Sequence, residues 1–496
     1  MQAVSQEWIK NLNAVTRKQG FVIVTLTRKS GTVITIDSRA AAAKILSMTH
    51  EQTYDPMGIS LPTNTVSIEL YNYYDAYTDL YIGDDPPQQI QVSYGYVLSS
   101  AETISGGKWA VSDMQLSDQI LTISGVSALE AASDKTIVYG DISNLPFVMF
   151  SGDFIRLGIL SYSDVTEPDV IPNARDVVSK INSVVPVTGN SSLADTDVYI
   201  SRSAQNSPGD VLQSITNGTL QRCTINREDK VVYSTDIPGS TQVMYINALS
   251  PYEITKAQKV SYISARSEKP NQPGSDGFSG VTTIEQTYFT DEPEGSGLDR
   301  YYFYHYFECD FYAYALYEVT FSGSSSKSQY EISCGYFQVR TGKVIQGYRV
   351  KYYGSSAAAV TFSVYPRAAE TQVTSDTYNA DGQVCDITNE YCEFKDFDKL
   401  ADYFGSTILH DIKIRGYPEI DAGDYIELQQ KDGSYDVCLV LSHELEFDGR
   451  FVSNIRCRAI NKAFEDAPSG SHLHLSQYTH QQLSGYTHQQ LSEGAI

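Results

Sequence analysis

Two histidines near the C-terminus are the residues of this chain best suited to bind a metal ion. His472 and His474 form a His-x-His pair, and imidazole suits transition metals. Pairs from three copies on a threefold axis would surround one ion with imidazoles. The pair, however, only begins a longer repeat, which favours a partner-binding role. We therefore expect no resident cofactor and keep His472 and His474 as the weaker, metal-binding hypothesis.

The tail that contains this pair repeats with a period of eight residues from Gly470 onward. A period of eight matches neither the coiled-coil nor the α-helical period, so no continuous helix is specified. The repeats are too short to build a core, and we expect linear motifs that order against a partner. The residues predicted to contact that partner are Tyr478, His480, Leu483, Tyr486, His488 and Leu491.

Other patterns resemble catalytic or ion sites but lack a required residue. Residues 377–388 imitate a calcium loop around Asp381 and Gly382, yet Thr388 stands where the closing glutamate belongs. Asp421 and Asp424 flank a glycine, which is typical of turn chemistry. Neither Gly-x-Ser-x-Gly nor His-Glu-x-x-His occurs. The sequence therefore predicts a protein that is not an enzyme.

Most of the chain ahead of the repeat tail is predicted to form β-strands. Tyrosine is abundant, with 37 residues, and charged residues make up only 19%, a composition that suits half-buried pleated surfaces. Residues 4–19 read as an amphipathic helix, and residues 21–27 and 32–36 as a hairpin. Residues 66–71 and 90–97 alternate apolar and polar side chains. Residues 1–150 are therefore predicted to form a run of short strands, as in a small barrel or sandwich.

The predicted secondary structure changes from about residue 170, where helices join the strands. Residues 173–185 and 207–220 have helical spacing, and a hairpin is expected around Glu228. This pattern predicts an α/β domain over residues 151–240. The predicted fold class is thus mainly β with an α/β insertion and a flexible C-terminal repeat tail.

The second strand-rich region is predicted over residues 241–465, with a loop-rich, tyrosine-rich insertion around 267–345. Residues 267–300 are rich in Gly, Pro, Ser and acids and are expected to form a long loop. Residues 301–307 form an aromatic strand, read either as a buried sheet or as a subunit interface. A helix is expected at 397–409, and residues 466–496 form the repeat tail.

Charge and cysteine usage limit the possible partners. The net charge of −24 repels phosphate, so we expect no sequence-specific binding of nucleic acid. The seven cysteines include no Cys-x-x-Cys and are read as free thiols in a reducing compartment. Neither a signal peptide nor an 18-residue apolar run is recognisable, so we expect no membrane segment.

Four stretches together resemble the tail hub, or baseplate hub, proteins of bacteriophages and phage-derived contractile particles. The most specific is Arg415-Gly-Tyr-Pro-Glu-Ile-Asp-Ala-Gly-Asp424. The others are the strand pattern of residues 53–74, the strands and Gly-Gly-Lys-Trp of residues 90–113, and the α/β unit at 173–235. The resemblance covers about 1–465 and is weakest at 236–345.

This resemblance implies two tube-like β-barrel domains, at residues 1–150 and 241–465, with a peripheral α/β domain at 151–240. It also implies a homotrimer that caps the distal end of the tail tube, with DNA passing through its lumen. Its implied partners are the tail tube, distal tail or baseplate proteins and the tape measure protein. The C-terminal repeats would hold a receptor-binding or fibre protein. The implied location is the virion tail tip or baseplate, after assembly in the host cytoplasm.

Two other function classes remain open at this point. β-Rich architecture and exposed tyrosines also suit a carbohydrate-binding, adhesin-like surface protein. A polysaccharide hydrolase is less favoured, because its pair of carboxylates is not recognisable without a fold.

Overall fold

The computed structural model is mainly β, which confirms the predicted fold class. It describes residues 4–460 apart from 13, 15–18, 41–44, 134–172, 183–184, 195, 197, 199–207, 235–241, 246–251, 271–281, 294–300, 310–313, 323–329, 355, 374–377, 379–380, 390–391, 393, 395–399 and 430–434. The C-terminal repeats therefore lie outside the described residues.

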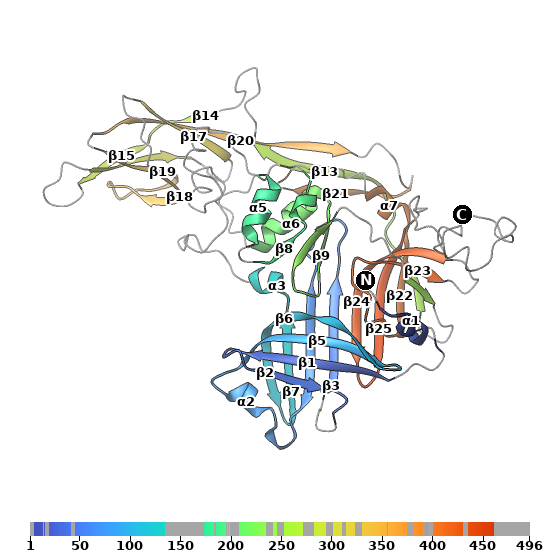
Figure 1. Ribbon diagram of the computed structural model, residues 1–496. Helices are drawn as coiled ribbons and strands as arrows, with labels where there is room; N and C mark the ends of the chain where they lie inside the picture. Colours follow the sequence, from blue (N-terminus) through green and yellow to red (C-terminus); the bar gives the residue numbers. More distant parts are fainter. Residues whose placement is uncertain are drawn as a thin grey trace.

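A 13-stranded sheet forms the body of the molecule (Figure 1). Its N-terminal strands are β1 (Gly20–Arg28), β2 (Val33–Asp37), β3 (Ile45–Thr53), β4 (Asn64–Tyr71), β5 (Pro87–Val97), β6 (Ala101–Ser117) and β7 (Ile120–Val126). Its later strands are β11 (Gln242–Tyr245), β12 (Tyr252–Lys256), β22 (Ile408–Arg415), β23 (Tyr425–Gln429), β24 (Tyr435–Phe447) and β25 (Phe451–Ala459).

The pairing of β24 with β3 joins the N-terminal strands and the later strands into this one sheet. Ser442 lies opposite Thr53, and Phe447 lies opposite Met48. The path runs β12-β22-β25-β24-β3-β4-β7-β6-β5-β1-β2. The two strand-rich regions expected from the sequence thus share one hydrogen-bonded sheet. Whether each closes as a barrel of its own stays a prediction.

One face of the sheet covers the main hydrophobic core. In β4, Val66, Ile68 and Leu70 are buried while the intervening residues are half exposed, as strand alternation requires. Strands β1, β2 and β5 cross over the other strands and close the core (Figure 1). Helix α1 (Gln6–Leu12) covers the core with Trp8, and the predicted amphipathic helix is confirmed over that shorter span.

A small α/β unit lies above one end of the sheet (Figure 1). It contains α5 (Ala174–Ile181), β8 (Val187–Thr188), α6 (Pro208–Thr219), β9 (Arg222–Ile225) and β10 (Val231–Ser234), with α3 (Ala128–Ser133) packed on α6. Both predicted helices and the hairpin around Glu228 are confirmed. Helix α6 begins at Pro208, whose fixed φ suits a first turn.

Two further sheets form a sandwich that extends away from the body (Figure 1). One holds β13 (Val260–Pro270), β14 (Thr282–Ile284), β17 (Tyr314–Ser322), β20 (Ala359–Val373) and β21 (Gln383–Asn389). The other holds β15 (Tyr288–Pro293), β16 (Tyr301–Glu308), β18 (Tyr330–Gln338) and β19 (Val344–Gly354). Phe307 and Phe362 stack between them at 4.9 Å.

One local prediction is wrong in this part of the chain, and another is confirmed over a shorter span. Residues 267–300 are not one loop, since β13 extends to Pro270 and β14 and β15 pair with long neighbours. Pairing with those strands outweighs the loop-favouring composition. The helix expected at 397–409 is α7 (Leu400–Gly405), because Ile408 and Leu409 already belong to β22.

Candidate functional site

The face of the large sheet opposite the core is polar, and we call it the polar face. It crosses β22, β25, β24, β3 and β4, so both halves of the chain contribute to it. Its residues are half exposed or exposed. They are Asp411, Lys413, Arg415, Arg456, Asn454, Ser442, Glu444, Glu446, Thr53, Glu51, Thr49, Ser47, Thr65, Ser67 and Glu69.

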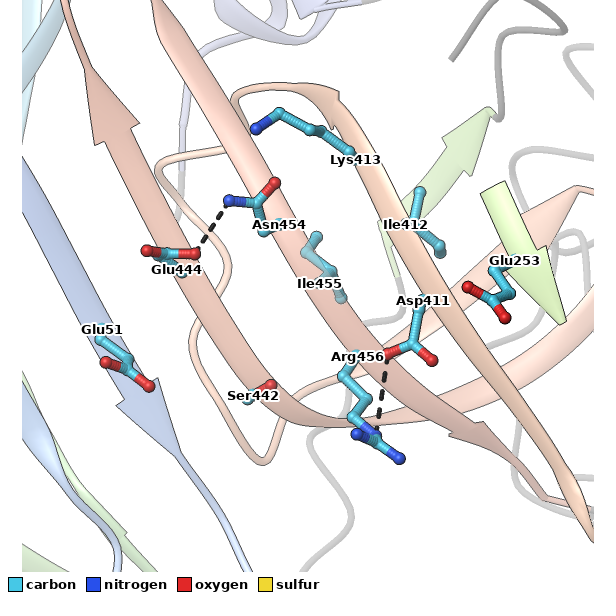
Figure 2. A pocket seen from close by; sticks show the side chains of 10 residues that line it. All are labelled: Glu51, Glu253, Asp411, Ile412, Lys413, Ser442, Glu444, Asn454, Ile455 and Arg456. Atoms are coloured by element: carbon cyan, nitrogen blue, oxygen red, sulfur yellow. Dashed lines mark hydrogen bonds and ion pairs between the residues drawn. The ribbon is translucent and has the colours of Figure 1, made fainter. Parts of the chain in front are cut away.

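A network of ion pairs and hydrogen bonds organises this face (Figure 2). Asn454 donates to Glu444 at 2.9 Å and to Glu446 at 2.8 Å. Arg456 lies 3.7 Å from Asp411, and Lys413 lies 3.7 Å from Glu446. Because these groups are half exposed, each pair stabilises the fold only weakly. The network mainly fixes where the carboxylates lie.

Strand register places the carboxylates from both halves side by side. Glu444 lies opposite Glu51 across the β24–β3 pair and opposite Asn454 across the β24–β25 pair. A shallow hollow of about 410 Å³ opens over these strands and also borders Glu253 of β12 (Figure 2). Acidic side chains outnumber basic ones on this face, so it repels phosphate.

Arg227 fastens the α/β unit to the body from the β9–β10 turn. Its Nε donates to Asp421 at 2.8 Å. One terminal nitrogen donates to the Ser105 carbonyl of β6 and the other to the Pro418 carbonyl, each at 2.6 Å. The Arg227 side chain is only 5% exposed. This guanidinium therefore joins the N-terminal strands, the α/β unit and the segment that precedes β23.

The Arg415–Asp424 motif is the structural junction that receives this arginine. Burial alone would raise the pKa of Asp421, but the charge and hydrogen bond of Arg227 and a hydrogen bond from Gln52 leave it below its usual value. Burial, with the Asp421 charge beside it, raises the pKa of Asp424. Asp424 accepts from the Asp421 backbone N–H at 2.9 Å, which confirms the predicted turn chemistry.

A second buried polar network lies beneath the polar face. His50 contacts Asn64 and the Tyr94 hydroxyl, both at 2.8 Å. His443 contacts the Ile420 carbonyl at 3.0 Å. Burial lowers the pKa of His50 to about 3 and that of His443 to about 4. Both imidazoles are therefore neutral at pH 7 and serve as fixed hydrogen-bonding groups.

The residues singled out from the sequence fall into two groups. His472, His474 and the predicted partner-binding residues of the repeats lie outside the described residues, and their roles stay predictions. Asp381 of the calcium-like loop forms an ion pair with Lys259 at 2.7 Å. Among the described residues, no group of three or more His, Cys, Asp and Glu could hold a metal ion.

Sequence reasoning missed the polar face and Arg227. Alternation in β3, β4 and β24 shows that Glu51, Glu69 and Glu444 lie on one side of each strand, but not that β24 pairs with β3. Arg227 belongs to no recognisable sequence motif. Its role depends on a turn and a segment almost 200 residues apart in sequence.

Comparisons with known proteins give a loose structural likeness. No protein-family model and no curated protein matches the sequence. A tail protein from Neisseria meningitidis is 8% identical, with a TM-score of 0.42 over 88% of this chain and 96% of its own. A 43 kDa prophage tail protein from Shewanella oneidensis is 9% identical, with a TM-score of 0.42 over 88% of this chain and 98% of its own.

A prophage tail protein from Listeria monocytogenes is 7% identical, with a TM-score of 0.40 over 89% of this chain and 94% of its own. TM-scores below 0.5 mark a likeness too loose to carry the function of this chain. In the part of the chain that the structure describes, no helix is both long and apolar enough to cross a bilayer.

Proposed function

We propose that this chain is a structural, non-enzymatic subunit of a phage or phage-like tail. In this proposal it is a homotrimeric hub at the distal end of the tail tube, and DNA passes through its lumen. Its partners are the tail tube, distal tail or baseplate proteins, the tape measure protein and, through the C-terminal repeats, a receptor-binding or fibre protein. The proposal starts from the sequence resemblance and gains support from the polar face.

The observation that carries it is the β24–β3 pairing. This pairing gives one chain a broad curved sheet whose core side is apolar and whose other side is polar and acidic. A channel wall for DNA needs a surface that stays hydrated and does not bind phosphate. Three copies that turn their polar faces inward would provide such a wall.

The same face does not favour hydrolysis of a polysaccharide. Three of its carboxylates, Glu444, Glu446 and Asp411, are engaged by Asn454, Lys413 and Arg456 on an open sheet. A glycosidase instead aims two carboxylates at one bond of a bound sugar, and one of them must be held protonated. We therefore propose a role in architecture.

Light scattering on the purified full chain tests the assembly. The expected mass is three times 55.0 kDa, either alone or after addition of the tail-tube protein of the same particle. A chain that stays monomeric in both conditions contradicts the hub proposal.

One observation favours carbohydrate binding as a second candidate function. Tyr302 and Tyr304 of β16 and Tyr353 of β19 lie half exposed on the outer face of the sandwich, and Lys351 sits 4.4 Å from the Tyr302 ring centroid. Aromatic side chains on a sheet face suit stacking against sugar rings. Affinity electrophoresis in gels containing host cell-wall polysaccharide tests this role: retardation that disappears in a Tyr302→Ala/Tyr353→Ala variant supports it.

A further inference from the structure

Residues 71–82 form an exposed aromatic projection at one end of the large sheet, which we call the tyrosine tip. It comprises the end of β4, a short turn of helix (Tyr73–Asp75) and α2 (Thr78–Ile82). Tyr74 is 85% exposed, Ile82 71% and Tyr81 43%. Single exposed apolar residues are common on surfaces, but several within one short segment indicate an interaction site.

The tip is held rigidly, although its side chains are exposed. Asn72 is buried, and both ends of its side-chain amide are bonded. The Nδ2 group donates to the Thr78 hydroxyl at 2.9 Å, and Oδ1 accepts from the Tyr77 backbone N–H at 2.6 Å. The Asn72 N–H donates to the Gln119 carbonyl at 2.6 Å, and Tyr71 donates to the Gln119 side chain. The tip is thus fastened to the β6–β7 turn.

Backbone strain is concentrated at the same place. Tyr74 and Asp75 have φ values of 53° and 55°, a left-handed conformation that costs energy for residues other than glycine. The Tyr73 hydroxyl bonds that of Tyr74 at 2.9 Å, and the Tyr73 ring stacks on Tyr71 at 5.5 Å. The structure maintains this strain while it presents aromatic rings to solvent, which suits preorganised recognition.

The position of the tip indicates which kind of contact it makes. Tyr71 lies opposite Ile120, so the tip and the β6–β7 turn share one end of the sheet. The β24–β25 hairpin turns at that end too, since Phe447 pairs with both Met48 and Phe451. A partner that contacts the tip therefore lies beyond the strand ends and not over a face of the sheet.

Charge defines the chemistry of that neighbour. Asp75, Asp84 and Asp118 are exposed around the aromatic group, and the chain as a whole carries −24. We propose that the tyrosine tip docks into an apolar socket edged by Lys and Arg on the protein ring stacked against this end of the hub. This inference rests on the proposed function, because it assumes an axially stacked neighbour.

Binding of the particle's own tail-tube and distal tail proteins to the full chain tests the inference. We would compare wild type with Tyr74→Asn/Ile82→Ser, since asparagine tolerates the left-handed backbone. The matched control is Tyr336→Ser, which removes a tyrosine 66% exposed on the sandwich. Light scattering and thermal unfolding establish that each variant keeps its assembly state and fold.

The expected result is that one of the two proteins binds wild type and the control equally and binds the tip variant at least about tenfold more weakly. Binding should also weaken as salt rises. Equal binding by the tip variant overturns the tip inference and leaves the hub proposal standing. No binding of either protein by wild type contradicts the hub proposal itself, and the tip inference with it.

Discussion

Arg227 Nε lies 2.8 Å from Asp421 Oδ1, and this pair joins segments that the sequence places far apart. The same guanidinium reaches the carbonyls of Ser105 and Pro418. The α/β unit is therefore tied to both halves of the large sheet by one buried side chain. Arg227 positions that unit against the sheet together with Arg222, which donates to the Gly423 carbonyl at 2.7 Å.

Replacing Arg227 with methionine should lower the free energy of unfolding of the large core by about 3–5 kcal/mol, because Asp421 loses its buried partner. Denaturant unfolding followed by tryptophan fluorescence measures this, since both tryptophans, Trp8 and Trp109, lie in that core. The control Lys413→Met removes a half-exposed pair and should change stability by less than about 1 kcal/mol. Equal effects of the two substitutions would contradict this account of the junction.

Acid should destabilise the same core. In the unfolded chain His50 and His443 titrate near 6.5, whereas burial lowers their folded pKa values to about 3 and about 4. Below pH 6.5 the unfolded state binds protons that the folded state excludes, so stability is full above that pH and falls as pH drops toward 4. Each histidine contributes up to about 3 kcal/mol to this loss. A tryptophan-monitored unfolding midpoint that stays constant from pH 7 to pH 5 would rule this out.

Asp229 should show the opposite pH dependence. Burial raises its folded pKa to about 6 from the ordinary 3.8, so the stability it contributes when protonated is lost as pH rises from about 4 to about 6. Asp229 accepts the Ala128 N–H at 2.9 Å, and asparagine keeps an acceptor there without the charge. Asp229→Asn should therefore stabilise the fold at pH 7 by about 1 kcal/mol, allowing for its partial exposure.

The gain from Asp229→Asn should shrink to a small fraction near pH 4 and disappear near pH 3, where aspartate itself is protonated in both states. The control is Glu228→Gln, which removes an exposed charge beside Lys230 and should leave stability unchanged at either pH, because solvent screens that charge. A stabilisation by Asp229→Asn that persists unchanged at pH 4 would show that burial of the charge is not its cause.

Reversing charge on the polar face should create DNA binding. Glu51→Lys/Glu444→Lys places two cations opposite each other across the β24–β3 pair. Retention of duplex DNA in gel shifts at low salt should appear in this variant and fade as salt rises. The control Glu285→Lys/Asp291→Lys makes the same charge change on exposed sandwich positions. Equal DNA retention by both variants would mean that the polar face has no special role.

Local features of the fold could be predicted from the sequence, and long-range ones could not. Alternation in residues 66–71 and the helical spacing around Val211 and Ile215 depend on neighbours within a few positions. The β24–β3 pairing joins residues almost 400 positions apart, and nothing in either strand specifies its partner. The Arg415–Asp424 motif could be recognised, but its partner Arg227 could not.

The loop expected at 267–300 shows the same limit. Thr282–Ile284 and Tyr288–Pro293 become strands because β20 and β16 pair with them. The composition of this segment favours a loop, but pairing with strands far away in the sequence outweighs that local preference. Tyr302 and Phe303 of the aromatic strand belong to opposite faces, so the sequence indicated their alternation but not what covers each face.

Electron microscopy of the purified assembly shows whether the chain forms a trimer whose polar faces line a channel. Class averages of the full chain with its tail-tube protein should show threefold rings with an open centre, and a reconstruction should place Glu51 and Glu444 on the channel wall. Rings with those residues on the outside, or particles without a central opening, would contradict the account.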